Sequence, residues 1–132
     1  MSTFTLHLHS AREFEQIEQV ESFVGEDGSG SFGLKAHHER FMTVLVFGLA
    51  RYRCTGQDWH YLALPGGLLY FIDNRLFVNT RRYLREADYR RISLALTEQL
   101  LKEEELLAGL RHNVRRLEES LLKQLLEMER AR

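Results

Sequence analysis

The hydrophobic pattern of this 132-residue chain changes its period once, near Glu86, and this change divides the fold into two parts. Before it, short apolar segments alternate with turns rich in Gly, Asn and Asp, as expected for a β-sandwich or a flattened barrel. After it, apolar residues recur every seven positions, which is typical of a helix that packs on another helix. We therefore predict an antiparallel β-sandwich over residues 1–84 and a helical segment over residues 85–132.

Several segments of the first part have clear strand signals. Apolar and polar residues alternate along residues 4–9, so one face of this strand should be buried. Residues 51–64 indicate a hairpin around a Thr-Gly-Gln-Asp loop, and residues 68–78 a second hairpin around Asp-Asn-Arg. Pro65-Gly66-Gly67 lies between them, and because proline cannot donate to a central ladder, the sheet must bend or change partner there.

Other segments allow more than one interpretation or carry a less regular pattern. Residues 14–24 fit either one bent strand or two short ones. The nearly continuous apolar run of residues 41–50 predicts one strand that is buried on both faces or crosses the sandwich core. His7 and His9 should share the outer face of the first strand, and without a third ligand in register we interpret them as solvated polar residues.

A glycine-rich turn and a short polar segment precede the run of residues 41–50. Gly28, Gly30 and Gly33 allow a tight change of direction, and no Lys-Ser or Lys-Thr pair follows them, so a phosphate-binding loop is disfavoured. The next segment, Ala36-His37-His38-Glu39-Arg40, is too short to bury its polar side chains. We call residues 36–40 the polar knuckle and expect it to face solvent or a partner.

The order of these motifs resembles the epsilon subunit of F-type ATP synthases over essentially the whole chain. The resemblance rests on Gly30-Ser31-Phe32-Gly33-Leu34, on His38, on the strand that ends in Gly48-Leu49-Ala50-Arg51, and on residues 61–69 with their glycine pair. Where the family usually has proline, glycine, alanine and proline, this chain departs from the pattern. The departures are typical of a divergent branch such as the alternate, sodium-type operon form, and they leave the coupling ion, proton or sodium, open. The differing residues are Ala36, His37, Glu39 and Arg40.

The resemblance implies a non-catalytic rotor subunit in the central stalk of a rotary ATP synthase. Such a subunit links the gamma subunit to the membrane rotor ring and lies peripherally on the cytoplasmic face of the bacterial plasma membrane. The family positions that contact the ring correspond to Ser29, Ser31 and His38, with Glu39 and Arg40 nearby. No cofactor is expected.

The helical part allows two geometries. Gly109 is the strongest helix breaker in it, and the heptad pattern keeps its phase across this residue. Gly109 therefore either acts as the hinge of an antiparallel helical hairpin, or lies within one helix of about 65 to 70 Å. The resemblance implies a hairpin that folds against the sandwich or extends along the rotor to block turnover. The heptad positions are Leu100, Leu107, Val114, Leu121 and Met128.

Basic residues cluster near and after Gly109, and their role has two interpretations. By resemblance, an extended tail presents them to acidic segments of the catalytic alpha/beta ring. Alternatively, they form a solvated helix face that Glu118, Glu119 and Glu127 balance. The basic residues are Arg111, Arg115, Arg116 and Lys123.

Composition and motifs disfavour several other functions. The net charge of -1 provides no field for nucleic acid, and Cys54, the single cysteine, cannot form an internal disulfide. The longest apolar run is about half of a membrane-spanning helix, so we expect no direct membrane insertion. No nucleophile and base are paired, and Leu117-Glu118-Glu119-Ser120 lacks the arginine of an epsilon-type ATP-binding motif. The alternative from another class is an adaptor or oligomerisation protein whose heptads form an intermolecular coiled coil.

Overall fold

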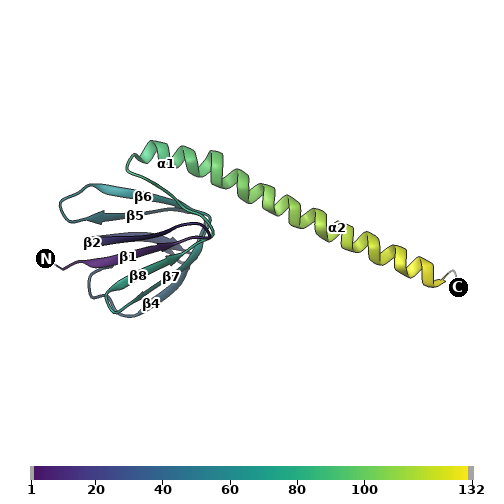
Figure 1. Ribbon diagram of the computed structural model, residues 1–132, viewed down its shortest axis with the longest axis horizontal. Helices are drawn as coiled ribbons and strands as arrows, with labels where there is room; N and C mark the ends of the chain where they lie inside the picture. Colours follow the sequence, from purple (N-terminus) through teal and green to yellow (C-terminus); the bar gives the residue numbers. More distant parts are fainter. Residues whose placement is uncertain (1, 131–132) are drawn as a thin grey trace. The chain divides into compact units, whose positions relative to one another are not determined.

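The computed structural model describes residues 2–130, and in this range strands are followed by helical segments (Figure 1). The strands belong to one continuous nine-stranded sheet that folds into two layers. Their pairing is antiparallel except for β1 with β8, which confirms the predicted β-sandwich with that one parallel exception. The strands are β1 (Phe4–His9), β2 (Phe14–Asp27), β3 (Gly30–Lys35), β4 (Phe41–Leu45), β5 (Gly48–Cys54), β6 (Trp59–Leu64), β7 (Gly67–Ile72), β8 (Arg75–Asn79) and β9 (Leu84–Glu86).

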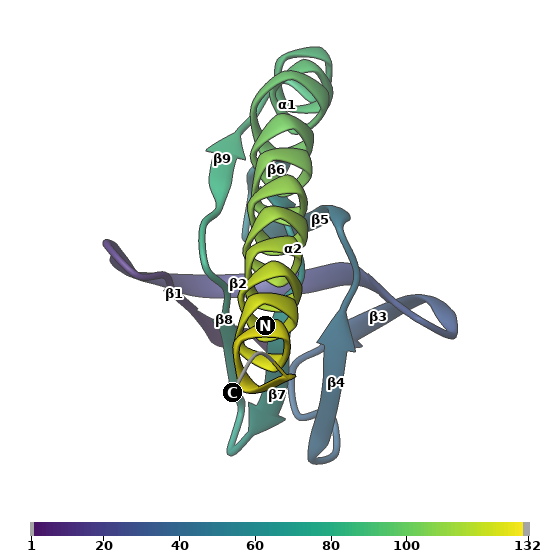
Figure 2. The same cartoon turned by 90° about the vertical axis from the view of Figure 1, so that its right-hand side faces the viewer.

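The long strand β2 belongs to both layers. Its first half pairs with β1, and from Val20 onward it pairs with β5 and β3. The register between β1 and β2 shifts next to Gln19, which has a positive φ of 59°. Of the two alternatives for residues 14–24, the structure therefore has the single bent strand. One layer contains β1, β8, β7 and β4, and the other contains β3, β5, β6 and β9 beside the second half of β2 (Figure 2).

Inward-facing side chains of both layers form the core. Leu6 and Leu8 are fully covered, and the ring of Phe4 meets the ring of Phe71 edge to face at 5.5 Å between centroids. Phe23 from β2 is also fully buried in this cluster. The predicted first strand is confirmed. Burial of these large apolar side chains supplies the main driving force for closing the sandwich.

The apolar run of residues 41–50 is two strands, so the prediction of one strand buried on both faces is wrong. The chain leaves β4, which pairs with β7, and continues as β5, which pairs with β6 and β2 in the other layer. Along β4 the side chains alternate, and Met42 and Val44 are 67% and 66% exposed. The outward side chains of β4 are themselves apolar, and for this reason the sequence showed no alternation.

Both predicted hairpins are present. β5 and β6 pair around residues 55–58, and β7 and β8 pair around Asp73 and Asn74, which both have positive φ. The chain changes sheet partners at Pro65-Gly66-Gly67, as predicted. A Cβ at Gly67 would lie 2.5 Å from the carbonyl oxygen of Asn79, so only glycine allows β7 and β8 to approach so closely.

Two helical segments belong with the strands. Helix α1 (Tyr89–Ala95) is capped at its N-terminus by Asp88, whose side chain accepts hydrogen bonds from the backbone N–H groups of Arg90 and Arg91. The π-helical segment η1 (Leu96–Leu101) follows directly. Ile92 and Leu100 are buried and pack with Ala63 of β6 in a second cluster. The first compact unit accordingly runs as far as Leu100, and the second begins at Leu101.

The second unit consists of helix α2 (Lys102–Arg130). Gly109 lies inside this helix, so of the two geometries predicted from the sequence, the structure has the continuous helix and not a hairpin closed at Gly109. A glycine costs about 1 kcal/mol in a helix interior, and the strong helix formers around it outweigh this cost. No helix among residues 2–130 combines the length and the apolar character needed to cross a membrane.

The packing of α1 and η1 predicts where the tail can be removed. We expect a chain that ends after Leu100 to melt cooperatively with the strand content of the full chain. Ending the chain after Asp88 removes Ile92 and Leu100 from Ala63, and should lower the free energy of unfolding by about 2 to 5 kcal/mol. Urea unfolding followed by circular dichroism measures the difference. Equal stability of the two truncated chains would contradict this account of the second cluster.

Candidate partner interface

The tip of the β2–β3 hairpin is ordered by one carboxylate. Asp27 Oδ1 accepts hydrogen bonds from the backbone N–H and the hydroxyl of Ser29, at 2.9 and 2.6 Å. Its other oxygen accepts the hydroxyl of Thr43 on β4 at 2.7 Å. Asp27 therefore holds the turn that presents Ser29 and Ser31 and fastens it to β4. The hydrogen bonds from the Ser29 side chain and then from Thr43 keep the pKa of Asp27 below its usual value of 3.8.

The polar knuckle is held from its backbone, while its side chains remain exposed. His37 has a positive φ of 62°, and its N–H donates to Asn74 Oδ1 at 2.9 Å. Asn74 also donates to the carbonyl oxygen of Thr3 at 2.8 Å, so this turn ties the knuckle to the first strand. His38 Nδ1 donates to the carbonyl oxygen of Glu39 at 2.8 Å.

The predicted ring-contact residues lie along one edge of the sandwich. Ser29 and Ser31 lie at the start of β3, and His38, Glu39 and Arg40 follow its end, a separation of about 20 Å by the rise of a strand. The structure therefore does not gather them into one compact site. Among the strands of residues 2–130, β3 pairs only with β2, and alternate residues along β3 are exposed, so an uncovered strip joins its two ends. The contact with a rotor ring stays a prediction.

The basic residues of the tail lie in two rows on α2 and are exposed. At about 100° per residue, Arg111 and Arg115 form one row, and Arg116 and Lys123 form another about 110° away around the helix. Each row has acidic neighbours: Glu118 lies beside the first and Glu119 beside the second. This geometry does not test whether these residues contact a catalytic ring, so that contact stays a prediction. The role of Gly109 as a hinge also stays a prediction.

Sequence reasoning missed a row of stacked rings on the outside of the first layer. The imidazole of His7 stacks on Phe77 at 4.6 Å and 9°, and Phe77 stacks on Tyr70 at 4.6 Å and 12°. His9 lies against Phe14 at 4.5 Å. His7 is only 8% exposed, so the prediction that it is solvated is wrong: its neighbours on β8 and β2 cover it. The Nε2 atoms of His7 and His9 are buried without a hydrogen-bond partner.

The register places further apolar side chains beside this row. Met42 lies opposite Tyr70, and Val44 lies opposite Leu68, which is 40% exposed. Large exposed apolar patches are uncommon on monomeric proteins and mark interaction sites. A strand with one exposed face usually shows polar residues at every second position. The exposed side chains of β4 are apolar, so the sequence carries no such signal. We call this surface the outer face; it contains His7, His9, Phe14, Met42, Val44, Leu68, Tyr70 and Phe77.

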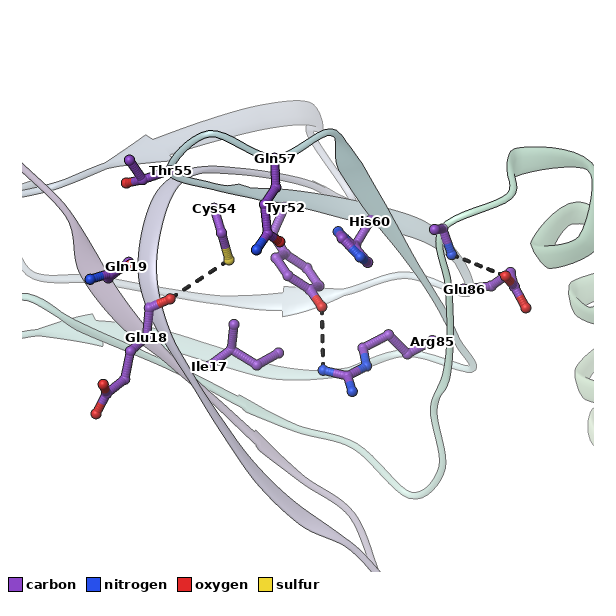
Figure 3. Close-up of a pocket in the computed structure, with 11 residues that line it drawn as sticks. Ile17, Glu18, Gln19, Tyr52, Cys54, Thr55, Gln57, His60, Arg85 and Glu86 are labelled. Atoms are coloured by element: carbon purple, nitrogen blue, oxygen red, sulfur yellow. Dashed lines mark hydrogen bonds between the residues drawn. The ribbon is translucent and has the colours of Figure 1, made fainter.

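A surface pocket of about 470 Å³ lies elsewhere, between β2, β5, β6 and β9 (Figure 3). The hydroxyl of the buried Tyr52 accepts a hydrogen bond from Arg85 at 3.4 Å, and the ring of His60 stacks on Tyr52. Arg85 also forms an ion pair with Glu15 at 3.0 Å. Burial is the largest influence on the pKa of Tyr52 and raises it. Arg85 therefore connects the buried hydroxyl of Tyr52 to the carboxylate of Glu15.

The thiol in this pocket is structural, as predicted. Cys54 is half-buried, its Sγ donates to the carbonyl oxygen of Glu18 at 3.6 Å, and burial raises its pKa. Arg51 and Arg53 do not activate it, because their guanidinium groups lie over the ring of Trp59. Among residues 2–130, no three or more His, Cys, Asp or Glu side chains are grouped to bind a metal ion.

The strand part of the chain matches a known family. The family described as ATP synthase, Delta/Epsilon chain, beta-sandwich domain matches residues 3–86. The chain belongs to the ATP synthase delta/epsilon chain family. This match covers β1 to β9 and ends just before α1, so membership rests on the sandwich.

Proteins named as epsilon chains are among the relatives. The chain is 35% identical over 83 residues to "ATP synthase epsilon chain 2" of Cereibacter sphaeroides, covering 62% of this chain and 57% of the relative. It is 40% identical over 60 residues to "ATP synthase epsilon chain" of Anaeromyxobacter sp. (strain K), covering 46% and 45%. The chain thus spans about half the length of these curated relatives.

Solved structures share the fold. A chain of the Euglena gracilis mitochondrial ATP synthase, in a structure of OSCP, F1 and the c-ring, has a TM-score of 0.60 at 23% identity, covering 74% of this chain and 64% of the other. A chain of the Tetrahymena thermophila mitochondrial ATP synthase central stalk and c-ring has a TM-score of 0.52 at 13% identity, covering 64% and 69%. At these identities the likeness concerns the fold alone.

The hairpin network predicts the titration of Asp27. In the folded chain, NMR should give a carboxyl pKa below 3.8, and Thr43→Val should raise it because one hydrogen bond to the charged form is lost. Thr55→Val, in the β5–β6 turn, is the control and should leave it unchanged. Because the pKa is lowered by folding, the charged carboxylate stabilises the hairpin above pH 3.8, and this contribution is lost as the pH falls through the lowered value. A pKa of 3.8 or higher would contradict the network.

Proposed function

We propose that the chain is a non-catalytic rotor subunit in the central stalk of an F-type ATP synthase or ion-pumping ATPase. The observation that carries the proposal is the family match over residues 3–86, the segment that forms the strands of the closed sandwich. The sandwich binds the gamma subunit and rests on the membrane rotor ring. It thereby transmits torque between ATP chemistry and ion movement without performing a chemical step itself.

The relatives support this assignment. Two bacterial proteins with 35% and 40% identity bear the name ATP synthase epsilon chain, and chains of the same fold occur in assemblies whose titles name a c-ring and a central stalk. A subunit with this role lies peripherally on the cytoplasmic face of the bacterial plasma membrane and is attached through its protein partners.

The ring contact is assigned to the exposed strip along β3. Ser29 and Ser31 supply hydroxyl groups at one end, and His38, Glu39 and Arg40 supply an imidazole and two charges at the other. These groups suit polar loops of a ring subunit. Exposed polar pairs contribute about 0 to 1 kcal/mol each, so the strip should act by the number of its contacts rather than by one strong pair.

The tail has two candidate roles. As a brake, α2 presents its basic rows to acidic segments of the catalytic alpha/beta ring. The alternative for the whole chain is an adaptor that oligomerises, and one observation favours it: α2 is a continuous helix whose heptad positions Val114, Leu121 and Met128 are 54%, 59% and 68% exposed.

Affinity purification tests the rotor assignment. The tagged chain, expressed in its own organism and extracted with mild detergent, should retain the gamma subunit and ring subunits. Changing Ser31 and His38 together to Trp should reduce recovery of the ring subunits while gamma remains, because only the strip along β3 is obstructed. Gln57→Trp, on the β5–β6 turn, is the matched control. Absence of both gamma and ring subunits from the wild-type purification, together with a dimeric mass of the isolated chain, would favour the adaptor.

Removing the tail tests the brake. In the assembled enzyme, ending the chain after Leu100 should raise ATP hydrolysis, because the sandwich remains and α2 is gone. Arg111→Glu with Arg115→Glu should give a similar increase if the first row makes the contact, and Arg116→Glu with Lys123→Glu tests the second row. Unchanged hydrolysis after truncation would refute the brake and leave the rotor assignment intact.

A further inference from the structure

Helix α2 carries an apolar stripe that is exposed to solvent. Leu110, Val114, Leu117 and Leu121 are 50%, 54%, 64% and 59% exposed, and no residue of Lys102–Arg130 is buried. At about 100° per residue, these four side chains lie within an arc of about 60° on one side of the helix. A narrow stripe with heptad spacing is the seam along which two helices pair.

The two flanks of this stripe differ in charge over residues 110–121. Arg111 and Glu118, both exposed, lie on one flank, whereas the uncharged Asn113 and Ser120 lie on the other. Arg111 precedes the middle of the stripe and Glu118 follows it. The charged flank is therefore self-complementary, because a copy of the helix turned end for end brings each charge opposite the other sign.

We propose that α2 pairs with the α2 helix of a second copy of this chain in an antiparallel, two-stranded coiled coil. Leu110 of one copy then packs on Leu121 of the other, and Val114 packs on Leu117, so that apolar side chains meet in successive layers. Between these layers Arg111 faces Glu118 of the other copy, and the two-fold symmetry makes this contact twice. Burial of the exposed stripe is the main driving force of the association.

The charges favour the antiparallel pair over a parallel one. In a parallel coiled coil, the charged flank of one helix meets the uncharged flank of the other. Glu118 would then face Asn113, and Arg111 would face Leu106, so neither charge would have a complement. Only the antiparallel arrangement places the guanidinium beside the carboxylate.

This pairing competes with the brake for one residue. Arg111 belongs to the first basic row, which in the brake contacts the catalytic ring. While Arg111 faces Glu118 of a second copy, that row is occupied, so the dimer is a form of the unassembled chain in which the tail is held. The pairing does not depend on the rotor assignment. Retention of the gamma subunit tests that assignment, and the mass of the isolated chain tests the pairing.

Sedimentation of the full chain at pH 7.5 and low salt tests the register. The wild-type chain should show a monomer–dimer equilibrium. Arg111→Glu and Glu118→Arg should each weaken dimerisation at least about fivefold, because two ion pairs become two contacts between like charges. The double variant should restore it to within about twofold. Residues 111 and 118 lie about 10 Å apart along one helix, so a contact within the chain does not explain such a rescue.

Matched controls lie on the side of α2 away from the stripe. Arg116→Glu and Glu119→Arg change the same charges there and should alter dimerisation little. Circular dichroism checks that each variant keeps its helix content.

Disulfide cross-linking tests the orientation. Two chains that differ in a mass tag, each with Cys54→Ser, carry Leu110→Cys or Leu121→Cys. Mixed and oxidised, they should form a disulfide between the two different chains. The Leu110→Cys chain alone should cross-link little, because its two cysteines lie about 16 Å apart along the axis of an antiparallel pair.

Each contrary result has a distinct meaning. A full chain that stays monomeric at every concentration would overturn the pairing, and retention of gamma by that chain would leave the rotor assignment intact. A dimer that the charge reversals leave unchanged would overturn the register. Efficient cross-linking of Leu110→Cys to its own copy would show a parallel pair and would overturn the orientation.

Discussion

The two layers of the sandwich depend on one strand that belongs to both. β2 pairs with β1 as far as Val20 and with β5 and β3 from Val20 onward, and its register with β1 shifts next to Gln19. The backbone of Gln19 also accepts a hydrogen bond from the N–H of Thr55 at 3.0 Å, which fastens the β5–β6 turn at the point of bending. Val20 and Phe23, which follow this register shift, are fully buried. Bulges of this kind increase strand twist and close a sheet on itself.

Closing the sheet in this way creates two different outer surfaces. The second half of β2 supports β3, whose exposed strip is polar, whereas β1 is joined through β8 and β7 to β4, whose outer side chains are apolar. The rotor function that we propose requires one firm contact and one lighter contact. The apolar face suits a tight, desolvated contact, and the polar strip suits a wetter contact made of many weak pairs.

Much of the strand order could be predicted, because turns and alternation encode it locally. The hairpins around residues 55–58 and Asp73-Asn74 and the change of partner at Pro65-Gly66-Gly67 needed no tertiary information. The division of residues 41–50 could not be predicted, because apolar residues on an exposed interface look the same as buried ones. His7 was misjudged for a related reason, since its cover comes from distant Phe77. Likewise, only the packing of Leu100 on Ala63 shows that the start of the helical region belongs to the sandwich.

The central proposal is that the sandwich is a subunit of a rotary ATP synthase and that assembly covers its exposed apolar side chains. Hydroxyl-radical footprinting tests this proposal most directly. Met42 is 67% exposed in the free chain, and its oxidation depends on access of solvent to its sulfur. The rate should be compared between the isolated chain and the chain in the purified, assembled enzyme. The account predicts that oxidation of Met42 slows severalfold on assembly, together with that of Phe14. Equal oxidation of Met42 in both states would contradict it.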